Sequence, residues 1–316
     1  MICVDTPFAQ VANYFFDQYE YKNIEFVWLP QSTVLIHKID SGLGKILQRN
    51  NYIKERFIWE KAIIYLAKRN KQIKIGFIGE YMKKHLLVEY KAQKNSLVSL
   101  QNGLFFERLK ENVISQRKIS NILKSLGVPL DRPLLFSFGR AEPYKGLDLV
   151  IKNSSDLIKE RNYFVLILAS PYFMDDPYVH DLNELAKKFP KDVKIVYGLD
   201  FLTPHYIMQW HNTKILALFS RAEPFGLIPA ESRFYKNVNL SLLTSDLDGY
   251  KEQISNGIDG FKTQLNDSSI QSMFMSLADL TLKDKTRMAI NGYNRVVRDD
   301  DQVRINCEFI KLYLAQ

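Results

Sequence analysis

The sequence predicts an α/β protein in which parallel sheets are covered by helices on both faces. From Arg132 onward, short apolar segments alternate with amphipathic segments of helical periodicity. Strands of a parallel sheet are buried on both faces and therefore form nearly continuous apolar runs. The chain has 316 residues, of which 46% are hydrophobic. This length and composition suit two domains, each with a core of its own.

The clearest elements lie in the second half of the chain. Apolar runs predict strands at 133–138, 162–170, 192–198, 213–220, 238–245 and 260–265. Helical periodicity predicts helices at 145–160, 178–189, 203–211 and 227–236, and three more helices after the last strand. The terminal helix, at 301–316, has an apolar stripe that needs a covering surface. We expect one doubly wound domain over residues 113–300.

The first third of the chain indicates a second, smaller α/β domain. Apolar runs predict strands at 24–29, 33–39 and 73–79, and the segment 52–70 has the spacing of a long amphipathic helix. The segment 114–133 has the pattern of a helix followed by a connection marked by Gly and Pro. The boundary therefore falls after an N-terminal domain of residues 1–112, on which we expect the terminal helix to pack.

Charge is distributed unevenly along the chain. Residues 1–110 hold 17 Lys and Arg against 10 Asp and Glu, whereas the remainder holds 26 against 25, for a net charge of +8. The excess favours an anionic partner, either a membrane surface or an acidic substrate, although a solvated basic face explains it equally well. The sequence lacks the interleaved aromatic and basic pattern of nucleic-acid binding, so we expect no nucleic-acid partner.

Composition also bears on the compartment. The first residues do not form a signal peptide, and no apolar run has the length of a membrane span. Cys3 and Cys307 lie far apart and lack metal-ligand spacing. We expect a cytoplasmic protein, with peripheral contact to the inner membrane surface as an extension of that expectation.

The segment FGRAEPYKG, residues 138–146, offers two cations at the end of a predicted strand. Arg140 leaves the strand and Lys145 opens the next helix. Ligands of doubly wound sheets bind beyond the carboxyl ends of the strands, so the pair suits a diphosphate. Two solvated loop charges would show the same pattern.

The segment SRAEPFGLIPAE, residues 220–231, places two carboxylates around a Pro-Phe-Gly turn. Glu223 follows a predicted strand and Glu231 lies in the following helix. Gly226 allows close approach of a ligand, and the N–H groups of Gly226 and Leu227 would face an anion. Alternatively, Glu223 is an acid favoured at a helix start and Glu231 is a surface residue.

Together with SDLDGYKEQISNGIDGF, residues 245–261, these segments resemble retaining glycosyltransferases of family 4. FGRAEPYKG resembles that family's GR…EKG segment, EPFGLIPAE its E-x7-E motif, and the third segment its SD-x-GG-x-xE…DG-x-NG segment. Residues 77–109 resemble the stretch before the family's linker, so the resemblance covers roughly residues 75–265. It implies a GT-B architecture of two Rossmann-like domains facing a cleft, with the N-terminal domain here reduced or truncated.

The resemblance also implies roles for individual residues. The second domain would bind a nucleotide-diphosphate sugar donor, and the first a hydroxyl acceptor. The donor-binding residues would be Gly139, Tyr197, Gly198, Leu199, Phe225, Gly226, Leu227 and Glu231, with Glu231 on the ribose. The catalytic residues would be Arg140 and Lys145 on the diphosphate and Glu223 on the sugar hydroxyls. The family often places a His after a strand of the first domain, and His37 is the candidate, although a structural His fits equally well.

The implied reaction is sugar transfer with retention of configuration and without a metal or other cofactor. Arg, Lys and a helix terminus supply the positive charge that the departing diphosphate needs. The favoured account for the family is attack from the front face, in which the leaving phosphate helps to remove the acceptor proton. The alternative is a catalytically silent paralogue that keeps the nucleotide site and acts as a binding or regulatory subunit.

Overall fold

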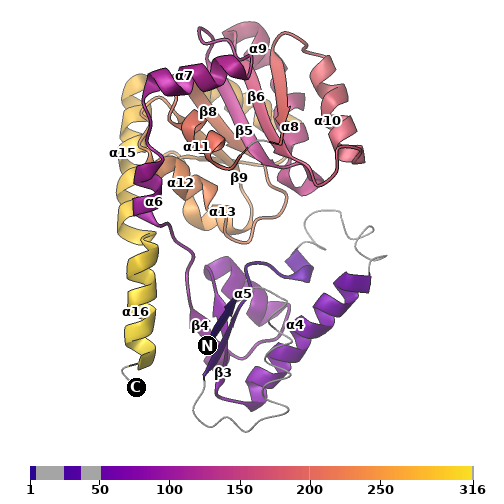
Figure 1. Cartoon of the computed structure of the whole chain (residues 1–316), viewed down its shortest axis with the longest axis vertical. Helices are drawn as coiled ribbons and strands as arrows, with labels where there is room; N and C mark the ends of the chain where they lie inside the picture. Colours follow the sequence, from indigo (N-terminus) through magenta and orange to yellow (C-terminus); the bar gives the residue numbers. More distant parts are fainter. Residues whose placement is uncertain (5–24, 37–50, 199, 315–316) are drawn as a thin grey trace. The chain divides into compact units, whose positions relative to one another are not determined.

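The computed structural model describes residues 1–4, 25–36, 51–198 and 200–314, and the chain divides into two compact units (Figure 1). The first unit comprises Met1–Gly103, Ala222–Phe225 and Gln302–Gln316. The second comprises Leu104–Arg221 and Gly226–Asp301. Each unit is built around its own parallel sheet.

The sheet of the first unit has four strands in the order β1-β2-β3-β4. These are β1 (Ile2–Val4), β2 (Phe26–Leu29), β3 (Ile73–Phe77) and β4 (Leu97–Ser99). The helices of this unit are α4 (Asn51–Arg69), α5 (Glu80–Val88), the short η2 (Lys94–Ser96) and α16 (Gln302–Leu314). Both α4 and α5 pack on β3. Trp28 and Ile75 are fully buried in the core of this unit, as the apolar runs predict.

The sheet of the second unit has six parallel strands in the order β10-β9-β8-β5-β6-β7. They are β5 (Leu134–Arg140), β6 (Phe164–Ser170), β7 (Val193–Tyr197), β8 (Thr213–Leu218), β9 (Ser241–Ser245) and β10 (Phe261–Thr263). Chain order runs outward from the centre in both directions, and it reverses between β5 and β8. This is the Rossmann order, and the reversal is its topological switch point.

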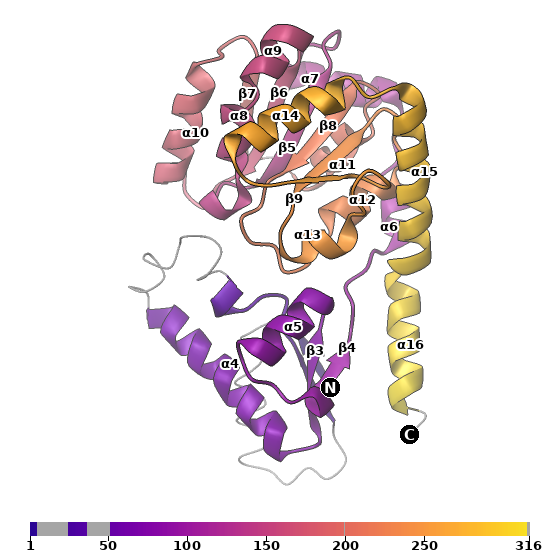
Figure 2. The same ribbon diagram turned by 180° about the vertical axis from the view of Figure 1, so that it is seen from behind.

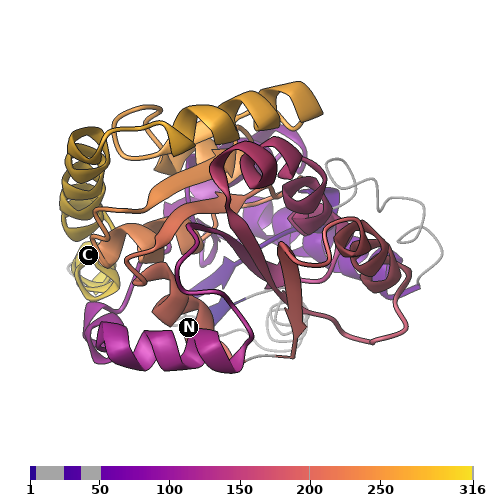
Figure 3. The ribbon, with the colours of Figure 1, turned by 90° about the horizontal axis from the view of Figure 1, so that it is seen from above.

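Helices cover both faces of this sheet (Figures 2 and 3). Residues such as Leu135 and Val165 face α8 (Leu147–Lys152), α9 (Ser155–Arg161), α10 (Pro177–Lys187) and α14 (Asp267–Ala278). Their neighbours Phe136 and Leu166 face α7 (Gln116–Ser125), α11 (Leu202–Met208) and α13 (Asp248–Gln253). A smaller cluster joins α6 (Phe106–Glu111), α12 (Ile228–Phe234) and α15 (Leu282–Asp299). Successive residues of a strand point to opposite faces, which explains the two separate cores.

Two sequence predictions differ from the structure. Val34–Ile36 are helical, so the strand predicted at 33–39 is wrong where the structure describes it. The backbone N–H of Val34 donates to both carboxylate oxygens of Glu60, at 3.2 Å each, which satisfies a donor at the start of this helix. An apolar run alone does not distinguish a strand from a buried helix start.

The helix predicted at 145–160 is interrupted. It consists of the 3-10 turn η3 (Pro143–Lys145), α8 and α9. Gly146 adopts a left-handed conformation with φ of 64°, and a Cβ there would lie 2.1 Å from the carbonyl oxygen of Phe219. Only glycine fits this close approach between the loop after β5 and the end of β8.

Candidate functional site

The carboxyl ends of β5 and β8 meet at the switch point, where ligands of Rossmann sheets bind. Arg140 is the last residue of β5, and the segment beginning at Phe219 follows β8. The loop from Arg140 to Gly146 therefore lies at this edge. Two of the sequence motifs thus meet at one place in the fold.

Arg140 and Lys145 are brought together around one aromatic ring. The guanidinium of Arg140 lies 5.1 Å and the ammonium of Lys145 lies 5.2 Å from the centroid of Tyr144. A Cβ on Gly139 would lie 3.6 Å from Cγ of Lys145, so the lysine stem runs beside that glycine. Cations gain from an aromatic face, which holds both side chains near the strand end.

Arg140 has two further contacts. Its Nη1 donates to the hydroxyl oxygen of Tyr172 at 2.8 Å and lies 3.7 Å from Oε2 of Glu142. Burial raises the pKa of the Glu142 carboxyl, while Arg140 and Lys145 oppose this effect. The Arg140 side chain remains 46% exposed. A guanidinium that is oriented but still accessible is suited to an incoming anion.

Arg221 fixes this loop, and the sequence analysis did not identify it. Its guanidinium donates to both oxygens of Asp148, at 3.0 and 2.7 Å, and to the carbonyl of Pro143. Tyr178 donates to the same carboxylate at 2.6 Å. Burial alone would raise the pKa of Asp148, but the bonds from Arg221 and Tyr178 outweigh it and hold the pKa below its usual value. The loop is therefore tied to the residue that follows β8.

Glu231 lies in α12 and has a different environment. No described residue donates a hydrogen bond to its carboxyl group, and burial raises its pKa to about 7. Gly226, which has φ of 78°, precedes this helix, and its carbonyl accepts a hydrogen bond from the Gln253 side chain. Leu227 is the residue directly before the helix. The region thus contains a partly buried carboxyl group that can accept hydrogen bonds from a ligand.

Glu223 and Phe225 belong to the segment Ala222–Phe225, which groups with the first unit. Phe225 is 5% exposed and Glu223 is half-buried. The predicted site residues are thus distributed over both units. His37 and Leu199, which the sequence also predicts as site residues, lie outside the described residues.

Tyr197 and Gly198 lie at the end of β7, at one edge of the second sheet. The hydroxyl of Tyr197 donates to Oδ1 of Asn183 at 3.0 Å. Gly198 has a left-handed φ of 73°, and its N–H bonds to the carbonyl of Ala169 on the neighbouring strand β6. This turn is separated from β5 by the single strand β6.

The third motif is held by a buried ion pair that the sequence did not reveal. Asp259 accepts hydrogen bonds from Arg233 at 3.1 Å and from Arg295 at 2.8 Å. Its other oxygen accepts from the N–H of Ser255 at 2.7 Å. Arg233 also donates to the carbonyl of Gln253, the residue that bonds to Gly226. The network therefore links the motif at 245–261 to the turn before α12.

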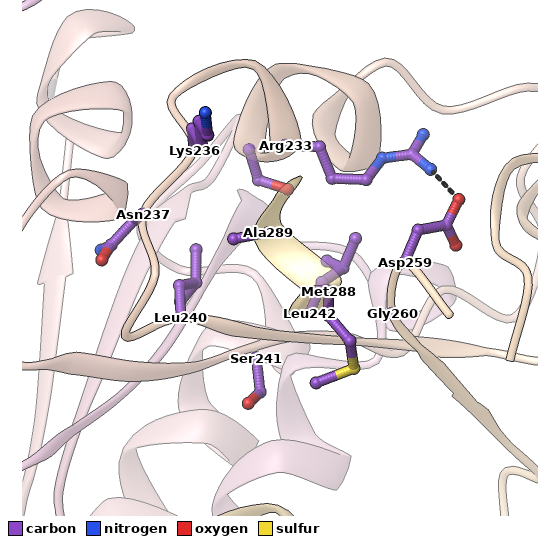
Figure 4. A pocket seen from close by; sticks show the side chains of 11 residues that line it. Arg233, Lys236, Asn237, Leu240, Ser241, Leu242, Asp259, Gly260, Met288 and Ala289 are labelled. Atoms are coloured by element: carbon purple, nitrogen blue, oxygen red, sulfur yellow. Dashed lines mark hydrogen bonds and ion pairs between the residues drawn. The ribbon is translucent and has the colours of Figure 1, made fainter. Parts of the chain in front are cut away.

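A hollow beside this ion pair lies near the amino-terminal ends of the strands (Figure 4). It is lined by residues of α12, of β9 and of α15, including Arg233, Ser241 and Met288. Ser241 is the first residue of β9, and Arg140 is the last residue of β5. Because the strands are parallel, the hollow and Arg140 lie at opposite ends of the strands. No predicted site residue lines this hollow.

Among the described residues, no group of three or more His, Cys, Asp or Glu side chains has an arrangement that could hold a metal ion. No helix in the described ranges is both long enough and apolar enough to cross a membrane.

Solved structures resemble the whole described fold. Sucrose-phosphate synthase from Thermosynechococcus elongatus matches with a TM-score of 0.76 at 15% identity, over 99% of this chain and 72% of that chain. Anabaena HepE in complex with UDP-glucose matches with a TM-score of 0.70 at 16% identity, over 92% of this chain and 72% of that chain. The fold is that of the GT-B glycosyltransferases, as predicted.

Sequence comparison defines the family. The family described as glycosyl transferases group 1 matches residues 118–296. Wheat (Triticum aestivum) granule-bound starch synthase 1 is 30% identical over 112 residues, which are 35% of this chain and 17% of that protein. Glycogen synthase of Hydrogenovibrio crunogenus is 30% identical over 100 residues, 32% of this chain and 19% of that protein. The matched regions are thus less than a fifth of these relatives. The chain belongs to the glycosyl transferase group 1 family.

Proposed function

We propose that this protein is a retaining, metal-independent glycosyltransferase that moves a sugar from a nucleotide-diphosphate donor to a hydroxyl acceptor. The observation that carries the proposal is the pair of cations, Arg140 and Lys145, over the ring of Tyr144 at the switch point. The pair stands where a Rossmann sheet binds a ligand, and it has the charge that a diphosphate requires.

The leaving group explains why two cations are needed. When the bond from the sugar to the diphosphate breaks, negative charge develops on the departing phosphate oxygen. Positive groups already in place stabilise that charge more than they stabilise the intact donor. Arg140 and Lys145 perform this role in our proposal, which leaves no step for a divalent metal. The acceptor oxygen then bonds to the anomeric carbon from the face that the diphosphate leaves, while the departing phosphate takes the acceptor proton, so configuration is retained.

Glu231 suits the nucleoside part of the donor. A partly buried carboxyl group that accepts no hydrogen bond from the described residues gains from hydroxyl donors, and the two adjacent hydroxyls of a ribose supply them. Gly139, Gly226, Leu227 and the turn at Tyr197 and Gly198 complete the proposed donor site. Glu223 and Phe225 are proposed to contact the sugar.

The nucleotide is best approached with UDP as the first probe, because a structure of Anabaena HepE contains UDP-glucose. We propose that the second unit, together with Glu223 and Phe225, binds this donor and that the rest of the first unit binds the acceptor. His37 and Leu199 stay in the proposal as predicted contacts, on the sugar and on the base.

Calorimetry on three variants and the unmodified protein tests the diphosphate site. Arg140→Ala and Lys145→Ala should each weaken UDP binding by about 1.5–3 kcal/mol, the contribution of a charge-assisted hydrogen bond. Lys187→Ala is the matched control, because Lys187 is an exposed lysine of the same unit and pairs with Glu184. Unchanged affinity in both site variants would refute the assignment. GDP and ADP serve as alternative probes if the unmodified protein does not bind UDP.

The outer face of α4 favours a second proposal, namely that the protein meets its acceptor at an anionic membrane on the cytoplasmic side. Ile58 and Tyr65 are 61% and 50% exposed on this helix, although its neighbour Ile63 is fully buried. Lys54, Lys68 and Arg69 are also exposed, and Glu55 is the only exposed acid of α4. Exposed apolar side chains flanked by cations suit the interface of an anionic bilayer.

A further inference from the structure

The loop after β6 places a tyrosine hydroxyl beside the proposed diphosphate site. Arg140 and Ser170 are paired in register at the ends of β5 and β6, and the N–H of Ala141 donates to the carbonyl of Ser170 at 2.9 Å. Tyr172 follows two residues later and reaches back to Arg140, whose Nη1 lies 2.8 Å from its hydroxyl oxygen. The two loops therefore run side by side beyond the sheet edge.

The direction of this hydrogen bond is fixed by chemistry. A guanidinium has donors and no acceptor, so the oxygen of Tyr172 must accept. The proton of the Tyr172 hydroxyl is left over, and no described residue accepts it. The Tyr172 side chain is 67% exposed, so this proton faces solvent. A hydroxyl that accepts from a cation is polarised and becomes a better donor toward an anion.

We propose that Tyr172 is a donor-binding residue in its own right, and that it gives its hydroxyl proton to a phosphate oxygen of the nucleotide while it accepts from Arg140. The inference rests on the proposed function, because it takes the diphosphate to bind at Arg140. It adds a neutral third ligand to the two cations. Accepting and donating at once, Tyr172 bridges the guanidinium and the phosphate, so the loop after β6 takes part in the site.

Tyr172→Phe tests this inference, because it removes the hydroxyl and keeps the ring. We expect UDP affinity to fall about tenfold, as for a hydrogen bond to a charged group. The unfolding temperature of the free protein should not change, since the side chain is mostly exposed. Phe173→Ala is the matched control, because Phe173 is the next residue, is 72% exposed, and should bind UDP as the unmodified protein does.

A double-mutant cycle separates direct contact from an effect through Arg140. If Tyr172 touches the phosphate, Tyr172→Phe should still weaken UDP binding at least threefold in an Arg140→Ala background, measured by thermal shift at millimolar UDP. A loss seen only when Arg140 is present would overturn the inference, because Tyr172 would then merely orient the guanidinium. Unchanged affinity in both backgrounds would overturn it as well. If the unmodified protein binds none of UDP, GDP and ADP, the proposed function fails together with it.

Discussion

A buried polar cluster of the first unit contrasts with the candidate site of the second. In the first unit, Glu60 is fully buried and accepts hydrogen bonds from the N–H of Val34, from Nε of Arg56 at 2.9 Å and from the hydroxyl of Tyr90. In the second unit, Arg140 is nearly half exposed, and the Glu231 carboxyl has no donor among the described residues. Buried polar groups with hydrogen-bond partners stabilise a fold, whereas accessible polar groups or groups without a partner can bind a ligand.

The buried cluster of the first unit extends to a histidine. His85 Nε2 lies 2.8 Å from Oγ1 of Thr33, and burial lowers the pKa of His85 to about 4 against the opposing charge of Glu89. Burial also raises the pKa of Glu60, although Arg56 and Tyr90 oppose it. The shift at His85 is large, yet both groups are enclosed and paired. A perturbed pKa is therefore not by itself a sign of a functional site in this protein.

A Glu60→Ala variant tests whether the buried cluster of the first unit has a purely structural role. Glu60→Ala removes an acceptor from the guanidinium of Arg56, the phenol of Tyr90 and the N–H of Val34, so we expect the free energy of unfolding of the first unit to fall by about 3–5 kcal/mol. UDP affinity of the folded protein should stay unchanged. Hydrogen exchange of α4 and β3 measures the stability of the first unit, and calorimetry measures the UDP affinity. Glu55→Ala, an exposed residue of the same helix, is the control, and equal effects of the two variants would contradict the structural role.

We expect replacement of Glu231 to stabilise the free protein, in contrast to replacement of Glu60. Its folded pKa of about 7 exceeds the usual value near 4.5, so the unfolded chain ionises first as pH rises. The free energy of unfolding therefore falls between pH 4.5 and 7, and it is not recovered at higher pH. Glu231→Gln removes this loss and should stabilise the free protein at pH 8 by about 2 kcal/mol, with no gain at pH 4.5. Denaturation at both pH values measures the difference, and a variant less stable than the parent at pH 8 would contradict it.

The same carboxyl group makes donor binding depend on pH. Ribose hydroxyls donate best to the ionised form, so binding lowers the pKa of Glu231 and releases a proton near pH 7. UDP affinity should rise severalfold from pH 6 to 8, and this dependence should vanish in Glu231→Gln. Calorimetry in two buffers of different ionisation enthalpy counts the proton directly. A pH profile identical in both proteins would place the ribose elsewhere.

The basic face of α4 should have a smaller effect, of about 1 kcal/mol for each cation near an anionic surface. The protein should co-sediment with anionic vesicles at low salt and be released as salt rises. Replacement of Lys54, Lys68 and Arg69 by Glu should abolish this binding. Lys61 is left in place, since it lies over Tyr90 and donates to the carbonyl of Glu89. Sedimentation that survives the triple change would mean that another surface binds the lipid.

The smallest expected effect is that of EDTA. Because Arg140 and Lys145 supply the positive charge in the proposed reaction, saturating EDTA should leave sugar transfer almost unchanged. Activity measured with and without the chelator checks this. Loss of transfer that Mg²⁺ or Mn²⁺ restores would overturn the metal-free mechanism.

The sequence predicts the second unit better than the first, for physical reasons. Strands such as β6 are buried on both faces, so their apolar runs are unmistakable, and the motifs follow strand ends. Contacts between distant residues left no local signal. Arg221 and Asp148 are 73 residues apart, and Val34 and Glu60 are 26 apart. The first pair fixes the loop from Arg140 to Gly146. The second stabilises a helix start where the sequence predicts a strand.

The salt bridge between Asp148 and Arg221 also has a thermodynamic consequence. It joins the loop after β5 to the residue following β8, and Tyr178 closes the same carboxylate from α10. The loop thus loses its conformational entropy when the chain folds rather than when the donor arrives. In the proposed reaction, binding of the diphosphate then costs little conformational entropy of the protein. A loop ordered before binding favours tight binding of one donor shape over adaptation to donors of different shape.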